Sequence, residues 1–185
     1  MISEIIESRR AVFPVQYNNQ SISKDEIKKI LEAANWAPTH RKTEPWRFKV
    51  FHSETARKKL ANFLSNTYKE TTENISEFKQ KKIAEKPMQS ACVIAICMQR
   101  DPNALVPEWE EVAATAMAVQ NMWLTAHDHK IGAYWSSPAL KDHLHNLVGF
   151  NEGERCLGFF YMGKYDENLP QGQRKTSIGE KTTWV

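Results

Sequence analysis

Residues 91–98 read ACVIAICM, a continuous apolar run with the length of one β-strand. A strand that is apolar at every position is typical of a sheet whose two faces are both covered. A helix rich in Ala and Met follows, beginning at Pro107 and running to about Lys130. Its near-continuous apolarity predicts a central helix buried on most sides. Together the two segments indicate a sheet with helices packed against it.

The flanking sequence supplies the other strands of this sheet. Trp46 to Phe51 alternates apolar and charged residues, which predicts a half-buried strand. Two further strands are expected at Ile131–Trp135 and Leu157–Met162, with a short helix between them at Ala139–Leu147. The last residues, Lys181–Val185, are expected to be extended.

Three helical regions are expected in the first half of the chain. Ile2–Arg10 places its isoleucines on one helical face. Ser23 followed by Glu26 is a capping box, and the helix that it starts should stop just before Pro38. Glu54 to Ala84 is polar and rich in helix formers, so we expect two exposed helices there, outside the core, acting as a lid or a dimer arm. The whole pattern predicts an α+β sandwich with a small, largely antiparallel sheet, formed by a single domain over residues 1–185.

Composition and charge exclude several classes of protein. The net charge of +3 comes from basic residues interleaved with acidic ones, which argues against a nucleic-acid-binding stripe. No apolar stretch approaches the roughly 20 residues that span a bilayer, and the opening MISEIIESRR has no apolar signal region. Three cysteines without a CxxC pair indicate buried, reduced thiols. We therefore expect a cytoplasmic protein that binds neither membrane nor nucleic acid.

Several catalytic and binding motifs are absent from the sequence. There is no GxGxxG, no GxxxxGK[ST], no HExxH and no GxSxG. The histidine pairs His127/His129 and His143/His145 are spaced by two, a spacing that does not share a helical face. We accordingly expect no metal site.

Three separated segments, taken together, resemble the flavin nitroreductase family, and most closely its small, minimal branch. The first is Ser8-Arg9-Arg10. The second is APTHRKTEPWRF at residues 37–48. The third is AVQNMWL at 118–124, followed by GAYWSS at 132–137, and the resemblance ends with GFFYMG at 158–163.

This resemblance implies an intertwined homodimer with two FMN sites at the subunit interface, each built from both chains. It implies that Arg9 and Arg10 bind the flavin phosphate and ring edge, and that the segment holding His40 covers the ring. Trp135, Ser136 and Ser137 would contact the cofactor. Arg174 and Lys175 are weaker candidates for a contact with the phosphate.

The chemistry of these residues agrees with the resemblance, and each also has a plainer interpretation. Arginine offers planar bidentate donors to a phosphate dianion, but two arginines after a helix can also be ordinary surface residues. His40 could equally be a solvated loop residue, and Trp135 a core residue. Ser136 and Ser137 could instead cap a helix around Pro138.

Three departures from the family pattern fall on candidate positions. Ala11 stands where many members have Ser, so one donor to the phosphate is lost. Trp36 stands where the small branch commonly has Arg, and Glu44 where many have Gln. Each change could weaken or displace a bound flavin, and none removes the framework.

The implied activity is an oxidoreductase that passes hydride from NAD(P)H through FMN to an electron-poor acceptor such as a nitroaromatic or quinone. Because no separate nicotinamide motif is present, both substrates should share one flavin face in a ping-pong mechanism. The alternative is a flavin-binding or flavin-handling protein with little reductase activity, and a third class is a basic interaction protein without a cofactor. The cofactor supplies the chemistry, so no catalytic side chain is nominated.

Overall fold

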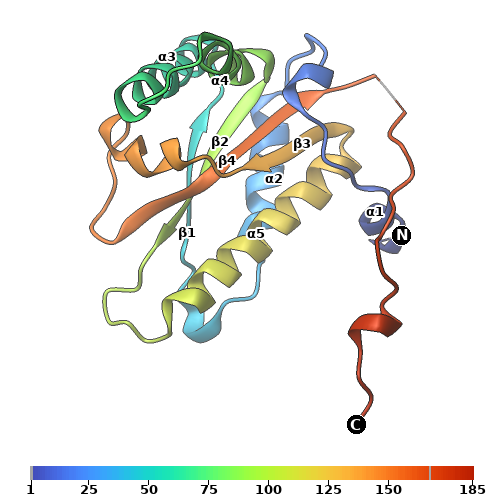
Figure 1. Ribbon diagram of the computed structural model, residues 1–185. Coiled ribbons are helices and arrows are strands. Elements are labelled where there is room, and N and C mark those ends of the chain that lie inside the picture. Colours follow the sequence, from blue (N-terminus) through green and yellow to red (C-terminus); the bar gives the residue numbers. More distant parts are fainter. Residues whose placement is uncertain (1, 167) are drawn as a thin grey trace.

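The computed structural model describes residues 2–166 and 168–185, and its centre is a four-stranded antiparallel sheet (Figure 1). The strand order is β1-β2-β4-β3. The strands are β1 (Trp46–Phe51), β2 (Cys92–Gln99), β3 (Ile131–Ser136) and β4 (Glu154–Lys164). The predicted central strand is confirmed, since seven of the eight β2 residues are buried. The α+β class with an antiparallel sheet is confirmed as well.

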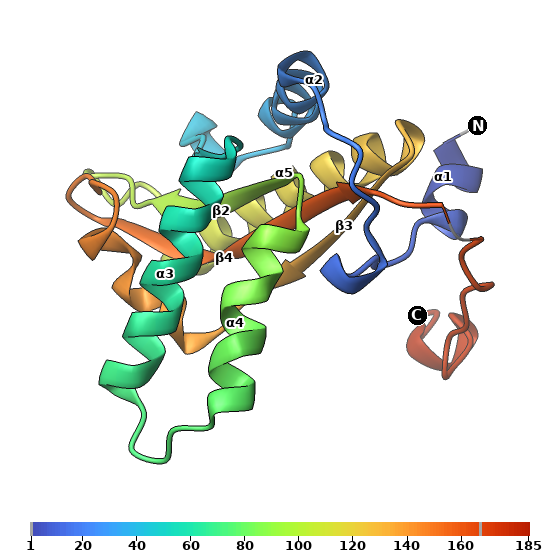
Figure 2. The ribbon, with the colours of Figure 1, turned by 90° about the horizontal axis from the view of Figure 1, so that it is seen from above.

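One face of the sheet is covered by α2 (Lys24–Asn35) and α5 (Glu108–Asp128), and Figure 2 shows the resulting layers. The α2 capping box is formed, with the Glu26 amide donating to Ser23 Oγ at 3.2 Å and the Ser23 amide donating to Glu26 Oε2 at 2.8 Å. The helix ends with Trp36 as its C-cap, two residues before Pro38, as predicted.

The opposite face is covered by a helical hairpin of α3 (Glu54–Thr71) and α4 (Glu77–Gln89). The prediction of two helices here is correct, but the prediction that they lie outside the core is wrong. Leu60, Leu64 and Tyr68 of α3 are buried against the sheet. They recur every four residues, so the many Lys and Glu residues of the outer face hid a narrow apolar stripe.

The prediction that α5 is buried on most sides also needs correction. Its inner face packs through Ala114, Ala118 and Met122. On its outer side, however, Trp109 is 69% exposed and Met117 is 41% exposed. The helix is apolar on two sides, and only one of them meets the sheet.

The N-terminal segment and the C-terminal segment pass each other at α1 (Figure 1). After α1 (Ile2–Ser8), the chain follows the β3 edge, where the Val12 amide donates to the Ala133 carbonyl at 3.1 Å. The C-terminal segment passes α1 and then extends away from the body. The expected helix after β3 is a 3-10 helix, η3 (Ala139–Asn146). The other 3-10 helices in the described residues are η1 (Pro14–Gln16), η2 (His40–Lys42) and η4 (Gly179–Lys181).

Among the described residues, no helix is both long enough and apolar enough to cross a membrane.

Candidate flavin site

Arg9 is a half-buried cation, and no carboxylate among the described residues forms an ion pair with it. Its guanidinium carbon lies 4.6 Å from the centre of the Trp123 ring. Arg9 Nε and Trp123 Nε1 are buried and have no hydrogen-bond partner among the described residues. Burial lowers the pKa of Arg9, and the charges of Arg10 and Arg174 lower it further. A buried guanidinium beside two like charges is stabilised by an anion, and a phosphate matches its donor geometry.

The side chain of Arg10 donates hydrogen bonds mainly to backbone carbonyls. Its Nε donates to the Pro170 carbonyl at 3.0 Å, and one Nη donates to the carbonyls of Glu7 at 2.5 Å and Arg9 at 2.8 Å. This side chain therefore fastens the C-terminal segment to the end of α1. That contact in turn keeps Arg174 close enough to influence the pKa of Arg9.

A serine and a histidine extend this cationic corner. Ser8 Oγ lies 2.8 Å from His127 Nε2, near the end of α5. Burial lowers the pKa of His127, and Lys130, Arg9 and Arg10 add to the shift. The lowered pKa favours the neutral imidazole beside the arginines. No local pattern predicts this contact, because residues 8 and 127 meet only in the folded chain.

A cleft, here called the β3 cleft, begins where the N-terminal segment passes β3. Its volume is about 430 Å³, and its walls include Phe13, Lys86, Tyr134 and Ser136. The rings of Phe13 and Tyr134 lie 4.9 Å apart, and Lys86 Nζ lies 5.9 Å from the Tyr134 ring centre. The exposed Ala11 precedes this cleft along the chain. A cleft with aromatic walls and a cation suits a flat heteroaromatic ring.

The three residues at the end of β3 have different surroundings. Trp135 packs against the core on the α5 side, and its Nε1 donates to the Leu157 carbonyl at 3.4 Å. Gly158 makes room for it, since a β-carbon there would lie 2.3 Å from Trp135 Nε1. Ser136 is half-buried in the β3 cleft, and Ser137 is exposed. Neither serine caps η3, whose N-cap is Pro138 without a side-chain hydrogen bond.

His40 lies at the other end of α5, and Trp36, the C-cap of α2, lies four residues before His40 in the chain. The side chain of Trp36 is 79% exposed, and His40 Nδ1 lies 2.5 Å from Glu110 Oε2 in the first turn of α5. At a rise of about 1.5 Å per residue, the stretch of α5 from Glu110 to His127 is about 25 Å long. Within one chain, therefore, the predicted site residues form two groups that do not meet.

The loop that carries His40 has an unusual backbone. Arg41, Lys42 and Glu44 all have positive φ angles, between 44° and 55°. Such angles are uncommon outside glycine and occur most often at turns and functional sites. The departure at Glu44 therefore falls on a residue with a constrained backbone.

Sequence reasoning missed several residues of the arrangement, namely Phe13, Lys86, His127 and Tyr134. Lys86 lies in a helix with many exposed lysines, so nothing in its local sequence distinguishes it. Phe13 and Tyr134 become neighbours only through the pairing of the N-terminal segment with β3.

Two relatives named as nitroreductases match most of this chain. The Bacillus subtilis protein named "Putative NAD(P)H nitroreductase YfhC" is 28% identical over 185 residues, covering 99% of this chain and 93% of its own length. The Escherichia coli K12 protein named "Putative NAD(P)H nitroreductase YdjA" is 26% identical over 156 residues, covering 83% of this chain and 81% of its own.

Solved structures share the fold. A nitroreductase-like family protein from Bacillus cereus superposes with a TM-score of 0.87 and 29% identity, covering 100% of this chain and 96% of that one. A Desulfovibrio desulfuricans structure described as "a putative nitroreductase in complex with fmn" superposes with a TM-score of 0.74 at 21% identity, with the same coverage. The model of the nitroreductase family matches residues 6–164, a range that includes Arg9, His40 and Ser136 but not Arg174, and this chain belongs to that family.

Proposed function

We propose that this protein is an FMN-dependent oxidoreductase that transfers hydride from NAD(P)H to an electron-poor acceptor such as a nitroaromatic or a quinone. The observation that carries the proposal is the half-buried Arg9 side chain, whose buried Nε has no hydrogen-bond partner among the described residues and whose pKa is lowered by the charges of Arg10 and Arg174. An FMN phosphate supplies the missing anion. The FMN complex of the Desulfovibrio relative supports the choice of flavin.

The residues present fit this cofactor along its length. Arg9 and Arg174 would hold the phosphate, and Arg10 would position the C-terminal segment that carries Arg174. The ring would lie in the β3 cleft, where Lys86 and Ser136 could donate to its polar edge. Bound FMN would supply the redox chemistry by accepting a hydride and returning two electrons to the acceptor.

We further propose that the single domain of residues 1–185 works as a homodimer with two shared sites. In one chain, Arg9 and His40 lie towards opposite ends of α5, so His40 cannot reach a flavin that is bound by Arg9 of the same chain. The exposed Trp36, Trp109 and Met117 give α2 and α5 an apolar surface suited to a second copy. In that dimer, Trp36 and His40 of one chain would cover the flavin held by Arg9 of its partner.

The order of binding follows from the absence of a separate nicotinamide motif in the sequence. NAD(P)H and the acceptor would use the same flavin face, so the oxidised nicotinamide must leave before the acceptor enters. Each turnover with a quinone consumes one hydride from NAD(P)H and one proton from solvent, and it yields a hydroquinone and NAD(P)⁺. The atoms and electrons then balance without a further reductant.

Two measurements test the proposal. Denaturing the purified protein should release a flavin whose fluorescence and chromatography identify it as FMN. Initial rates at varied NAD(P)H and acceptor should give parallel double-reciprocal lines, whereas intersecting lines would show a ternary complex. If FMN-loaded protein oxidises neither NADH nor NADPH, the flavin-handling alternative replaces the reductase. If the protein takes up no flavin, both are wrong.

A further inference from the structure

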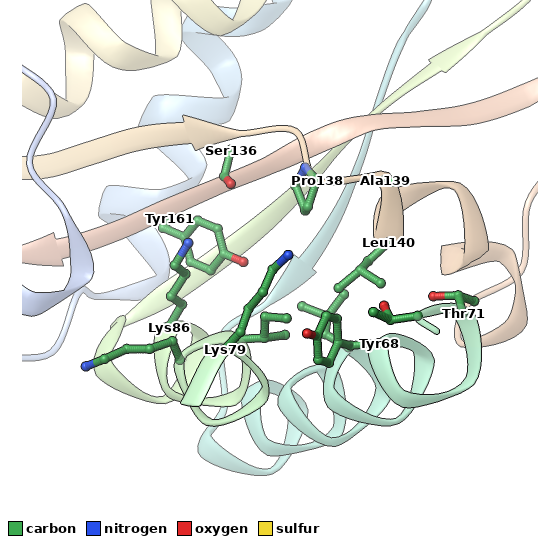
Figure 3. A pocket seen from close by; sticks show the side chains of 13 residues that line it. Tyr68, Thr71, Lys79, Lys86, Ser136, Pro138, Ala139, Leu140 and Tyr161 are labelled. Carbon is green, nitrogen blue, oxygen red and sulfur yellow. The ribbon is translucent and has the colours of Figure 1, made fainter. Parts of the chain in front are cut away.

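A second cavity lies beneath the α3–α4 hairpin, next to the β3 cleft. It has a volume of about 440 Å³ and opens between the hairpin and the end of β3 (Figure 3). We call it the hairpin cavity, and its walls include Leu64, Tyr68, Lys79, Ile83, Leu140 and Tyr161. It shares Lys82, Lys86 and Ser136 with the β3 cleft, so the two spaces are neighbours.

The floor of the hairpin cavity is apolar and aromatic. Leu64, Tyr68 and Leu140 are all buried, and they pack in the core cluster on this face of the sheet. Cavities of a few hundred cubic ångströms with such walls accommodate a single substituted ring. The floor therefore favours a small, flat, aromatic ligand.

Tyr161 places a polar group in this apolar wall. The residue is 2% exposed. In Figure 3 its hydroxyl faces the cavity. Burial raises the pKa of Tyr161 well above its usual range, so the hydroxyl stays protonated and can donate. A ligand in the cavity would accept a hydrogen bond from this hydroxyl.

Three lysines of α4 line the same space. Lys79, Lys82 and Lys86 follow one another at intervals of three and four, which places them on one face of the helix. Lys82 Nζ lies 3.1 Å from Glu85 Oε2. Among the described residues, no carboxylate lies within ion-pair distance of Lys79 or Lys86. Figure 3 shows both side chains rising from α4 towards the sheet.

We infer that the hairpin cavity binds a flat aromatic compound that carries a carboxylate or a similar anionic group. The ring would lie on Leu64 and Leu140, Tyr161 would donate to a polar substituent, and Lys79 would pair with the anion. One part of the inference rests on the proposed function, namely that this ligand is the electron acceptor. The wall residues Lys86 and Ser136, which both cavities share, would place the ring of the ligand beside the proposed flavin. Binding itself does not require turnover.

Calorimetric titration with 4-nitrobenzoate and its neutral counterpart 4-nitrobenzamide tests this inference directly. Wild-type protein, loaded with FMN, should bind the carboxylate about tenfold more tightly than the amide, since charge-assisted contacts are about twice as strong as neutral ones. Lys79→Gln should lower that ratio about fivefold, with the loss moderated by solvent exposure. Lys81→Gln is the matched control, because Lys81 is absent from the cavity wall and its side chain is 77% exposed. Tyr161→Phe, which keeps the ring, should weaken both ligands.

The outcomes separate this inference from the proposed function. Equal affinity for the two ligands, or an equal effect of Lys79→Gln and Lys81→Gln, would overturn the anionic class. Displacement of 4-nitrobenzoate by FMN would show that the cavity belongs to the flavin, and would overturn the inference as well. If the protein takes up no FMN, the proposed function fails, and the same titration on the protein as purified still decides the inference.

Discussion

Arg9 and Arg10 are sequence neighbours with different surroundings, and the difference comes from which groups satisfy their donors. The guanidinium of Arg10 donates to three carbonyls, whereas that of Arg9 packs on Trp123, and its buried Nε has no described partner. A residue whose donors are already used contributes less to a ligand than one whose donors are not. The two arginines should therefore respond differently to mutation.

Arg9→Ala should lower FMN affinity at least about tenfold, since a hydrogen bond to a charged group is worth on the order of 1.5–3 kcal/mol. Fluorescence titration of flavin-free protein with FMN measures the change. Lys58→Ala, which removes an exposed cation from α3, controls for net charge. Equal losses in both variants would assign Arg9 a long-range role only.

Arg10→Ala should act first on the C-terminal segment. Loss of the bond to the Pro170 carbonyl frees residues 168–174, so their amide hydrogens should exchange faster, and trypsin should cleave sooner after Arg174. FMN affinity should fall less than in Arg9→Ala, because Arg10 acts by positioning the chain. Unchanged exchange together with a larger affinity loss would reverse the two roles.

At this scale, the sequence pointed to residue types for a flavin site but not to their grouping. Arg10 and Arg174 lie close enough to Arg9 for their charges to lower its pKa, and their binding of a flavin phosphate is a prediction. The plain alternative for Trp135, core packing, agrees with its contacts. Lys86 and His127 could not have been selected, because their significance comes from tertiary neighbours that no local pattern encodes.

Among the elements, those with a strong local signal were predicted most accurately. β2 and α2 match their predicted positions closely, because a fully apolar run and a capping box are short-range signals. The hairpin of α3 and α4 was placed outside the core, because its mean polarity concealed the stripe at Leu60, Leu64 and Tyr68. The mean polarity of a segment does not show which face of its helix packs against the sheet.

The start of α2 carries a stability prediction with a defined pH dependence. The hydrogen bond from Lys164, at 2.6 Å, is the largest cause that lowers the pKa of Glu26, and the Ser23 amide adds to it, bringing the pKa to about 2. A carboxylate with a lowered folded pKa stabilises the fold above its unfolded pKa of about 4.3, and that stabilisation is lost as the pH falls towards 2.

Glu26→Gln should accordingly reduce the free energy of unfolding by about 1–2 kcal/mol at pH 7, a value discounted for the solvent exposure of the pair. Urea unfolding at pH 7 and pH 3 measures the difference, which should be smaller at the lower pH. Glu32→Gln on the exposed side of the same helix is the control. A destabilisation that does not change with pH would indicate lost packing in place of lost charge.

For the whole molecule, the central question is how two groups of site residues that are separated along α5 could serve one flavin. His40 contacts Glu110 at the start of the helix, and Ser8, next to Arg9, contacts His127 near its end. A rigid helix fixes this separation at about 25 Å, so no local rearrangement can close it. In the proposed homodimer, a second copy of the chain would bring the two groups together, and it would also cover the exposed Trp36 and Met117.

Mixed dimers of two single variants test this arrangement. Consider one chain with Arg9→Ala paired with a chain that carries His40→Ala. If each site takes Arg9 from one chain and His40 from the other, one site contains both substitutions and the other site contains neither. Flavin titration of the purified mixed dimer should then show one tight site per dimer. Homodimers of either variant should show none at the same FMN concentration, since each of their sites carries one substitution.

If both residues of a site came from one chain, every site of the mixed dimer would carry one substitution, and no tight site would appear. Size-exclusion chromatography with light scattering verifies the dimer before titration, and a monodisperse monomer that retains FMN would rule out shared sites altogether.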